Sequence, residues 1–415
     1  DELGAEVVTH VGSFASGIRA AGPAASIEVR DLAALGNAVD HARQAAEHEL
    51  AALVGNGLRV QLARASSDFT EYDGNLGARV DAEVFPLPGV GDRALSASRL
   101  ESWATCGFKY FLSYVLEIAD RDDPERTDEL SALDRGSLIH VTLEEFVRGE
   151  LDNPPGPDEQ WSEAARARLH KIADDECGKY EQAGRTGRRV NWRVQQDDLH
   201  DLLDAFLAAD NEFRRTHLAT PHRVELDLGV KSGHVVPVTL PNGDSITLRG
   251  MVDRVDLTAD GRVLVSDYKS GNADKYKQLK DDPFMAGTTL QLGMYAEGAI
   301  QETGRPDAAA HYWRVERAGD DQRVGYTWTP ELRARFHDVL TAITSGIGAG
   351  VFAAQPGEWD TWRQTNDNCG YCDFDSVCVR DRGDHEIAKA DAPELAVRVA
   401  LSPPAVEPVE QVGEC

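Results

Sequence analysis

The spacing of hydrophobic residues predicts mainly helices in the first half of the chain. From Ser98 to residue 217, apolar side chains recur every three or four positions, which is the period of an amphipathic helix. Ser98 and Glu101 match a capping box, so we expect a helix to begin there and to continue past Cys106. Further helices are expected over Gly136–Arg148 and within 160–217.

From His222 the hydrophobic period falls to two, the alternation of β-strands. A helix is expected again over Leu290–Ala299, and a turn over Pro241–Asp244. The predicted strands are Val224–Leu228, Val235–Leu240, Ser245–Leu257, Val263–Lys269 and His311–Val315. Helices and strands together indicate the α/β class.

The two ends of the chain differ from this middle part. Residues 1–85 have a helix-and-loop pattern without recognisable chemistry, and Gly74–Gly91 is a connector with Pro and Gly that suits a domain boundary. Residues 389–415 are expected to form a disordered tail. Because the chain begins at Asp1 rather than Met, we expect it to be the C-terminal piece of a longer polypeptide, or a trimmed one.

Two of the predicted strands bring acidic residues together. Between them lies Ala259-Asp260-Gly261, a loop ending in glycine that suits a tight hairpin. Asp253 and Asp267 are equally far from the loop centre, so they should face each other with Cβ atoms roughly 4.5–5.5 Å apart. Lys269 follows on the same face. Such a group is costly unless paired or metal-bound, so the hairpin is either a cation site or a surface hairpin with an Asp–Lys salt bridge.

Cysteine spacing indicates a second metal site. Cys369, Cys372 and Cys378 form a C-x2-C-x5-C pattern, one thiolate short of a four-ligand site, and Cys106 is the natural fourth. Clustered thiolates suit Zn²⁺ or an iron–sulfur cluster, and the spacing does not decide between them; buried free thiols are the alternative. Cys177 and Cys415 have no partners at ligand spacing and are not expected to be ligands.

The net charge of −28 opposes a nucleic-acid partner on average, because phosphate binding depends on Lys and Arg. A local basic stretch such as Arg185–Arg193, or bound cations, can override that average, although a solvated surface explains the stretch equally well. The chain has no apolar run of the roughly 18–20 residues that a membrane span needs, and no signal peptide. We therefore expect a cytoplasmic protein without membrane contact.

Several motifs resemble those of a nuclease family. Gly250-Met-Val-Asp-Arg-Val-Asp256, Ser266-Asp-Tyr-Lys-Ser-Gly271 and Gln291-Leu-Gly-Met-Tyr295 are similar to the nuclease motifs of the RecB branch of the PD-(D/E)XK superfamily. The helix Gly136–Glu144 is similar to the helix that contributes a histidine ligand in that family.

The resemblance implies roles for individual residues. It implies His140, Asp253 and Asp267 as ligands of Mg²⁺ or Mn²⁺, and Asp253, Asp267 and Lys269 as the catalytic residues. Accessory roles fall on four further residues: Glu144, which could hold the imidazole of His140, help the metal indirectly or be merely solvated; Glu225, an additional acid; and Gln291 and Tyr295, along the DNA path.

The segment Ser98–Phe111 with Cys106 resembles iron–sulfur nucleases of the same superfamily, including AddB-like and AdnB-like helicase–nuclease subunits. In those proteins one cysteine precedes the nuclease core and three follow it. The resemblance implies a 4Fe–4S cluster on Cys106, Cys369, Cys372 and Cys378 that joins the two ends of the domain. Gly107 stands where the family usually has Pro, which puts the helix geometry after the first ligand in doubt.

The resemblance also implies a fold and a function. Residues 86–388 would form a restriction-endonuclease-like core, a mixed central sheet flanked by helices, while residues 1–85 would be a helical remnant of a helicase-like domain or a linker. The implied activity is metal-dependent DNA cleavage by an exonuclease module of a helicase–nuclease complex with a partner subunit, acting in double-strand-break repair and recombination. Two alternatives are a catalytically silent iron–sulfur DNA-binding scaffold and a stand-alone iron–sulfur exonuclease.

Overall fold

The chain forms two compact units, Asp1–Asp73 and Gly74–Cys415. In the first unit the described part contains helix α4 (Ala51–Ala65) and a turn in which the carboxylate of Asp73 accepts hydrogen bonds from the amide and hydroxyl of Thr70. The rest of the expected N-terminal helical region and most of the expected connector lie outside the described residues. The computed structural model describes residues 51–77, 94–118, 129–231, 234–271, 273–315, 323–379 and 381–402.

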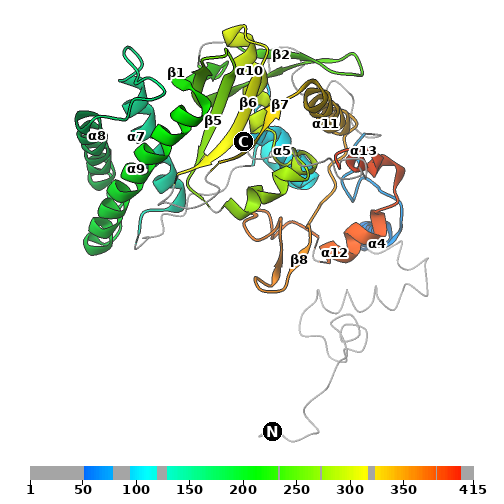
Figure 1. The fold of residues 1–415 in the computed structure, drawn as a ribbon. Coiled ribbons are helices and arrows are strands. Elements are labelled where there is room, and N and C mark those ends of the chain that lie inside the picture. The colour runs from blue at the N-terminus through cyan, green and yellow to red at the C-terminus, as the bar shows by residue number, and fades with distance from the viewer. Residues whose placement is uncertain are drawn as a thin grey trace, which may run out of the picture. The chain divides into compact units, whose positions relative to one another are not determined.

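A five-stranded mixed sheet forms the centre of the second unit (Figure 1). β1, β4 and β5 are antiparallel neighbours, β5 and β6 run parallel, and β7 is antiparallel to β6. A parallel pair needs a crossover connection, and helix α10 (Gln291–Thr303) lies in it. In spatial order the strands are β1 (Ala219–Leu228), β4 (Gly250–Thr258), β5 (Val263–Lys269), β6 (Ala308–Arg314) and β7 (Arg323–Trp328).

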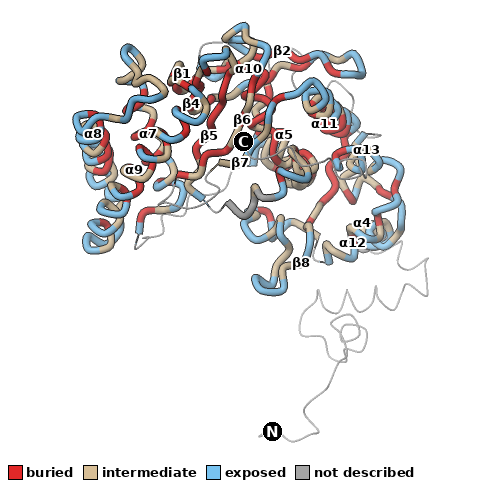
Figure 2. Tube along the Cα trace, in the orientation of Figure 1, coloured by how far each residue is buried: buried red, intermediate tan, exposed pale blue. Residues whose placement is uncertain are grey.

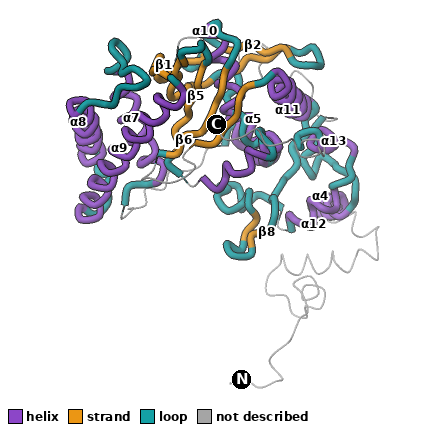
Figure 3. Tube along the Cα trace, in the orientation of Figure 1, coloured by secondary structure: helices purple, strands orange, loops and turns teal. Residues whose placement is uncertain are grey.

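Helices cover both faces of this sheet, which confirms the expected α/β class with a mixed, flanked sheet (Figure 3). On one face, α7, α8 and α9 share a core with Leu264, Tyr268 and Trp313 of the strands. On the other face lie α5, α10 and α11. Because both faces are covered, every residue of β5 from Val263 to Tyr268 is buried (Figure 2). The helix bounds are α5 (Ala97–Thr105), α7 (Ala132–Arg148), α8 (Glu163–Gln182), α9 (Arg189–His217) and α11 (Pro330–Gly348).

The start of α5 differs from the sequence expectation. The capping residue is Ser96, whose hydroxyl accepts a hydrogen bond from the amide of Arg99 at 3.3 Å, so the capping box on Ser98 is wrong. Glu101 does not reach back to the helix start. Its carboxylate accepts from the amide of Leu290 at 2.6 Å, so a tertiary contact takes the side chain that the local motif would have used.

The same helix does not run through Cys106. At that residue the backbone is extended (φ −158°, ψ 111°), and the chain resumes as α6 (Gly107–Tyr110) and a π-helical turn over Phe111–Val115. Cys106 therefore lies at a break between helices rather than on a helix face. The Gly107 position, where the related proteins usually have Pro, directly follows this break.

One predicted strand, Ser245–Leu257, is two strands in different sheets. β3 (Ser245–Leu248) pairs with β2 (Val236–Thr239) in a separate two-stranded sheet, while β4 begins at Gly250 in the central sheet. The predicted turn Pro241–Asp244 is present between β2 and β3 and is closed by the amide of Leu240, which donates to the carbonyl of Asp244 at 2.8 Å.

Part of the expected disordered tail is folded. The side chain of Arg398 in α13 donates to the carbonyls of Trp103 at 3.0 Å and of Ala104 at 2.5 Å, while residues 403–415 lie outside the described residues. Among the described helices, none combines the length and the apolar character that crossing a membrane requires. The C-terminal elements are β8 (Trp359–Asp360), β9 (Thr365–Asn366), α12 (Arg382–Lys389), a 3₁₀ turn (Pro393–Leu395) and α13 (Ala396–Val399).

Candidate active site

The β4–β5 hairpin has the register that its loop predicts. Gly261 adopts φ +92°, a conformation that favours glycine, and the amide of Thr258 donates to the carbonyl of Arg262 at 3.0 Å. The ladder pairs Val255 with Val265 and Arg254 with Ser266. The next residues of the two strands, Asp253 and Asp267, are thus brought to the same end of the hairpin.

Asp267 is the most buried acid of the hairpin end, at 3% exposed. Burial raises its pKa to about 6, although the neighbouring Lys269 acts in the opposite direction. The Lys269 ammonium forms an ion pair with Asp267 and donates to the side-chain oxygen of Gln291 at 3.0 Å. Burial alone would lower the pKa of Lys269, but the carboxylate of Asp267 outweighs it and the pKa is raised, so the amine stays charged.

Asp253 is held from two sides. One of its carboxylate oxygens accepts a hydrogen bond from the amide of Tyr268 at 2.7 Å and lies 3.3 Å from Nδ1 of His140. Burial disfavours the charged imidazole, but the hydrogen bond and charge of Asp253 outweigh that cost and raise the pKa of His140. His140 comes from α7 on one face of the sheet and Gln291 from α10 on the other. Residues from both helical layers thus contact the acids and the lysine at this end of the hairpin: His140 contacts Asp253, and Gln291 contacts Lys269.

Glu225 in β1 is a third acid beside Asp253 in β4 and Asp267 in β5, and we call these three residues the acidic row. Its neighbours Val224 and Leu226 pair with Arg254 and Val252, so Glu225 stands opposite Asp253. Burial raises the pKa of Glu225 to about 7, with the charges of Glu144 and Asp253 adding to the rise. Glu225, which the family resemblance implies as an additional acid, thus lies beside the hairpin acids, and its role stays a prediction.

Two accessory candidates have other contacts. Glu144 forms an ion pair with Arg148 at 2.5 Å one helical turn further on, rather than holding the imidazole of His140. Tyr295 is buried, and its ring packs on Gly250: a Cβ there would lie 2.8 Å from Cε1 of Tyr295. Gly250 thus permits the close approach of α10 to β4, while Gln291 on the same helix reaches Lys269.

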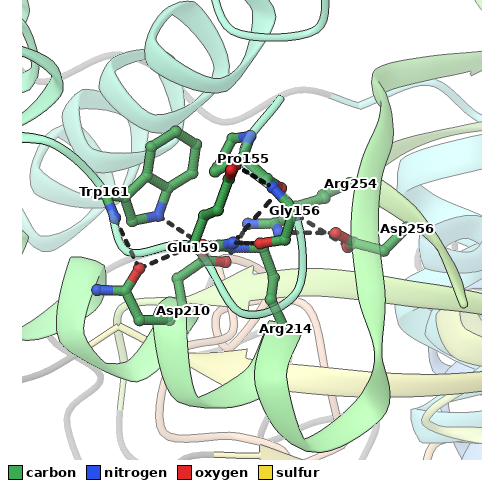
Figure 4. A network of polar contacts seen from close by, with 9 residues as sticks. Pro155, Gly156, Glu159, Trp161, Asp210, Arg214, Arg254 and Asp256 are labelled. Carbon is green, nitrogen blue, oxygen red and sulfur yellow. Dashed lines mark hydrogen bonds and ion pairs between the residues drawn. The ribbon is translucent and has the colours of Figure 1, made fainter. Parts of the chain in front are cut away.

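Sequence reasoning missed a buried charge network behind the hairpin (Figure 4). Asp210 and Arg214 of α9 and Arg254 and Asp256 of β4 have side chains that are 0% exposed. Arg254 donates to Asp210 at 2.6 Å and to the two carboxylate oxygens of Asp256 at 2.8 and 2.7 Å. Two cations and two anions thus balance, as buried charges must.

The network also holds the loop between α7 and α8. Arg214 donates to Asp210 at 2.9 Å and to the carbonyl of Gly156 at 2.5 Å, and the indole of Trp161 donates to Asp210 at 2.6 Å (Figure 4). A signal for it was present in the sequence: Arg254 alternates with Asp253, so its side chain had to point to the opposite, helix-covered face. The network fixes β4 to α9 one residue away from Asp253.

The cysteine segments lie close together. The side-chain amide of Asn368, next to Cys369, donates to the carbonyls of Thr105 and Gln355, both at 3.2 Å, and the amide of Gln355 donates to the sulfur of Cys106 at 3.4 Å. Burial raises the pKa of the Cys378 thiol, and the nearby Cys106 and Cys369 add to the rise. None of the cysteines Cys106, Cys369, Cys372 and Cys378 forms a disulfide.

The two cysteines not expected to be ligands stand apart. Cys177 is buried in α8, where burial raises the pKa of its thiol to about 11. Cys415 lies outside the described residues.

The basic stretch Arg185–Arg193 covers the end of the connection between α8 and α9 and the first turn of α9. Arg185 forms an ion pair with Asp134 in the first turn of α7, and its guanidinium lies 5.5 Å from the ring of Tyr180. Arg185 therefore lies beside the start of the helix that carries His140.

The donor atoms fit a divalent cation in their chemistry. Carboxylate oxygens and one imidazole suit Mg²⁺ or Mn²⁺, and apart from the Lys269 ammonium the buried Oδ2 of Asp267 has no hydrogen-bond partner among the described residues. Within the part of the chain that the structure describes, no three or more His, Cys, Asp or Glu side chains are arranged as a ready-made metal site. Both expected metal centres therefore belong to the proposals below.

The mixed sheet lies between helical layers and carries two acids and a lysine at the end of the β4–β5 hairpin. The model of the PD-(D/E)XK nuclease superfamily matches residues 94–379, and the chain belongs to this superfamily.

Several similar proteins have names that describe a helicase–nuclease subunit. The chain is 35% identical over 229 residues to an ATP-dependent helicase/deoxyribonuclease subunit of Symbiobacterium thermophilum, a match that covers 52% of this chain and 18% of that protein. Proteins of the same name from Clostridium perfringens and Carboxydothermus hydrogenoformans are 26% and 27% identical, over 59% and 58% of this chain and 21% and 22% of their own lengths. The chain thus spans about a fifth of the length of these relatives.

Proposed function

We propose that this chain is a DNA nuclease module that hydrolyses phosphodiester bonds with the help of Mg²⁺ or Mn²⁺. The observation that carries the proposal is the convergence of Asp253, Asp267 and Lys269 at one end of the hairpin, with His140 beside Asp253. A bound divalent cation would polarise the scissile phosphate and activate water. The residues that would hold it are His140, Asp253 and Asp267.

Side chains of the protein would stabilise the developing charge and hold the acids in position. Lys269, kept charged by Asp267 and steered by Gln291, stabilises the negative charge that develops on the phosphate. The amide of Tyr268 and the imidazole of His140 fix the carboxylate of Asp253. Because Asp267 acts as an anion, cleavage requires this carboxyl to be deprotonated.

Cleavage of end-labelled single-stranded DNA with Mg²⁺ or Mn²⁺ tests the proposal. Asp267→Asn should lower the rate on the order of a hundredfold or more, because an anionic ligand of the proposed cation is lost together with the partner of Lys269. Asp175→Asn, a change at a surface ion pair of α8, is the matched control and should cut like the wild type. Labels on the 5′ or 3′ end then distinguish exonuclease from endonuclease products. Undiminished cleavage by Asp267→Asn would remove the assignment.

We further propose that the four cysteines carry a 4Fe–4S cluster, with Zn²⁺ as the alternative. The extended break at Cys106 and the bridge from Asn368 to Thr105 support a shared centre, since they bring the first cysteine to the segment that holds the other three. The visible spectrum and iron content of the protein, purified without air, provide the test. Cys372→Ser should lose broad visible absorbance while Cys177→Ser keeps it; a colourless, zinc-containing wild type would overturn the cluster.

We also propose that the chain belongs to a helicase–nuclease complex in the cytoplasm that processes DNA double-strand breaks; the names of the relatives support the helicase–nuclease part of this proposal. In this proposal the polypeptide containing the chain associates with a second helicase–nuclease protein. The complex should degrade linear duplex DNA only with ATP, whereas this chain alone should cut DNA equally well without it. Cleavage by the isolated chain that depends on ATP would contradict this division of roles.

A further inference from the structure

An aromatic pair stands beside the Asp267–Lys269 ion pair. Tyr276 belongs to the 3₁₀ helix Ala273–Lys280 that follows β5, and its ring centroid lies 4.3 Å from that of Tyr312 in β6, with the planes tilted by 34°. The ammonium of Lys269 lies 5.0 Å from the centroid of the same Tyr312 ring. The pair therefore borders the place where the proposed function puts a phosphate.

The register of the sheet puts Tyr312 in line with the acids. Tyr312 pairs with Asp267 in the parallel β5–β6 ladder, so both side chains leave the same face, on strands about 4.8 Å apart. Tyr312 is buried, whereas Tyr276 is half-buried and covers it. The outer aromatic surface next to the acidic row is consequently the ring of Tyr276, backed by a second ring.

The segment around Tyr276 has the charge that a nucleic-acid strand requires. The 3₁₀ helix Ala273–Lys280 reads ADKYKQLK, with three lysines and one acid, in a chain whose net charge is −28; two aspartates, Asp281 and Asp282, follow it. Aromatic rings interleaved with basic residues are the pattern of single-strand binding, in which bases stack on the rings and the cations follow the phosphates.

We propose that Tyr276, supported by Tyr312, stacks on the nucleobase next to the phosphate that is held at Asp253 and Asp267. This subsite rests on the proposed nuclease function and adds a substrate form to it. Its occupant is an unpaired base of single-stranded DNA, because a base inside a duplex already has both faces covered by its neighbours.

A substrate change combined with a protein change tests the stacking. Single-stranded oligonucleotides with and without one abasic residue are cut by the wild type, Tyr276→Phe and Tyr276→Leu, and the rate is measured at the bond beside that residue. In the wild type and in Tyr276→Phe, the missing base should slow cleavage there by about five- to 150-fold, the range that corresponds to ~1–3 kcal/mol of stacking. Tyr276→Leu should show a similar loss on the intact strand and little further loss on the abasic one.

Binding of the same fluorescently labelled oligonucleotides in EDTA gives a second readout that needs no cleavage. Tyr276→Leu should weaken binding of the intact strand and leave the abasic strand unchanged, and Tyr72→Leu, outside the nuclease unit, should change neither. Thermal melting shows whether each variant is folded. The subsite is overturned if the abasic residue changes neither cleavage nor binding by the wild type. It is also overturned if the abasic residue weakens cleavage and binding by Tyr276→Leu as much as by the wild type. If the wild type binds with this base dependence but does not cut, the nuclease proposal fails and the subsite stands.

Discussion

Glu225 combines backbone strain with charge repulsion in one residue. Its φ of +47° lies in the left-handed region, which costs energy for a side chain other than glycine, within a β-strand. Burial and the charges of Glu144 and Asp253 raise the pKa of its carboxyl to about 7, against an ordinary value of 4.5. Such a residue persists only where its surroundings, or a bound cation, compensate for it.

The raised pKa of Glu225 predicts how stability changes with pH. The folded protein holds this proton more tightly than the unfolded chain, so its stability should fall as pH rises from 4.5 through about 7. Glu225→Gln removes the titrating group. Its melting temperature, measured in EDTA, should therefore match the wild type near pH 4.5 and exceed it increasingly towards pH 8. A constant difference across that range would contradict the burial argument.

The residues of the site and of the charge network behind it differ in how far the sequence alone predicts their positions. Asp253, Asp267 and Lys269 lie on two strands joined by a short loop, so counting residues from Asp260 is enough to place them. Asp210 and Arg214 lie on a long helix with many charged residues, and nothing local distinguishes a buried ion from a solvated one. Their partner Arg254 is near in space only because the whole sheet packs on α9.

Among the elements, α9 and β4 depend on their shared buried charges. Arg254→Ala would leave the carboxylates of Asp210 and Asp256 buried without their main partner, so it should cost about 3–5 kcal/mol of unfolding free energy. Arg166→Ala breaks an ion pair on the surface, where solvent screens the charges, and should change the unfolding free energy much less. Urea unfolding of both variants measures the contrast; equal losses would mean that the network contributes no more than a surface pair.

Helix α11 packs on α5 through a glycine. A Cβ at Gly346 would lie 2.2 Å from Cζ2 of Trp103, so Gly346→Ala should destabilise the protein by about 1–3 kcal/mol. Gly178 in α8 has nothing within 4 Å of the same position, so Gly178→Ala should stabilise the protein by about 0.5–1 kcal/mol through helix propensity alone. Thermal melting of the two variants should therefore show shifts of opposite sign, and two shifts of the same sign would refute this packing.

The limits of sequence reasoning at this scale have physical causes. Alternation continues from β3 across Arg249 into β4, because each strand has a buried face, and the pattern does not reveal that the two faces belong to different sheets. The capping box predicted for α5 is wrong because Glu101 contributes to a contact with Leu290, far away in the chain. Tertiary demands thus override local motifs where both use the same side chain.

At the scale of the whole molecule, the family motifs and the alternation of elements were enough to predict a mixed sheet between helices. The family resemblance also implied that four cysteines join the two ends of the nuclease unit, but it did not predict the direct hydrogen bonds between those ends. Asn368 joins the segment after the core to Thr105 before it, through hydrogen bonds that need no metal. Arg398 adds a second link, since its guanidinium also lies 4.8 Å from the ring centroid of Trp103.

That second link bears on where a recombinant fragment should stop. The family match ends at residue 379, and a cloning boundary chosen from it would delete Arg398 and expose the carbonyls of Trp103 and Ala104 just ahead of Cys106. A fragment that extends to Ser402 should melt at a higher temperature than one that stops at Lys389, and should resist proteolysis near Cys106 for longer. The practical end of this nuclease unit lies beyond its recognisable motifs.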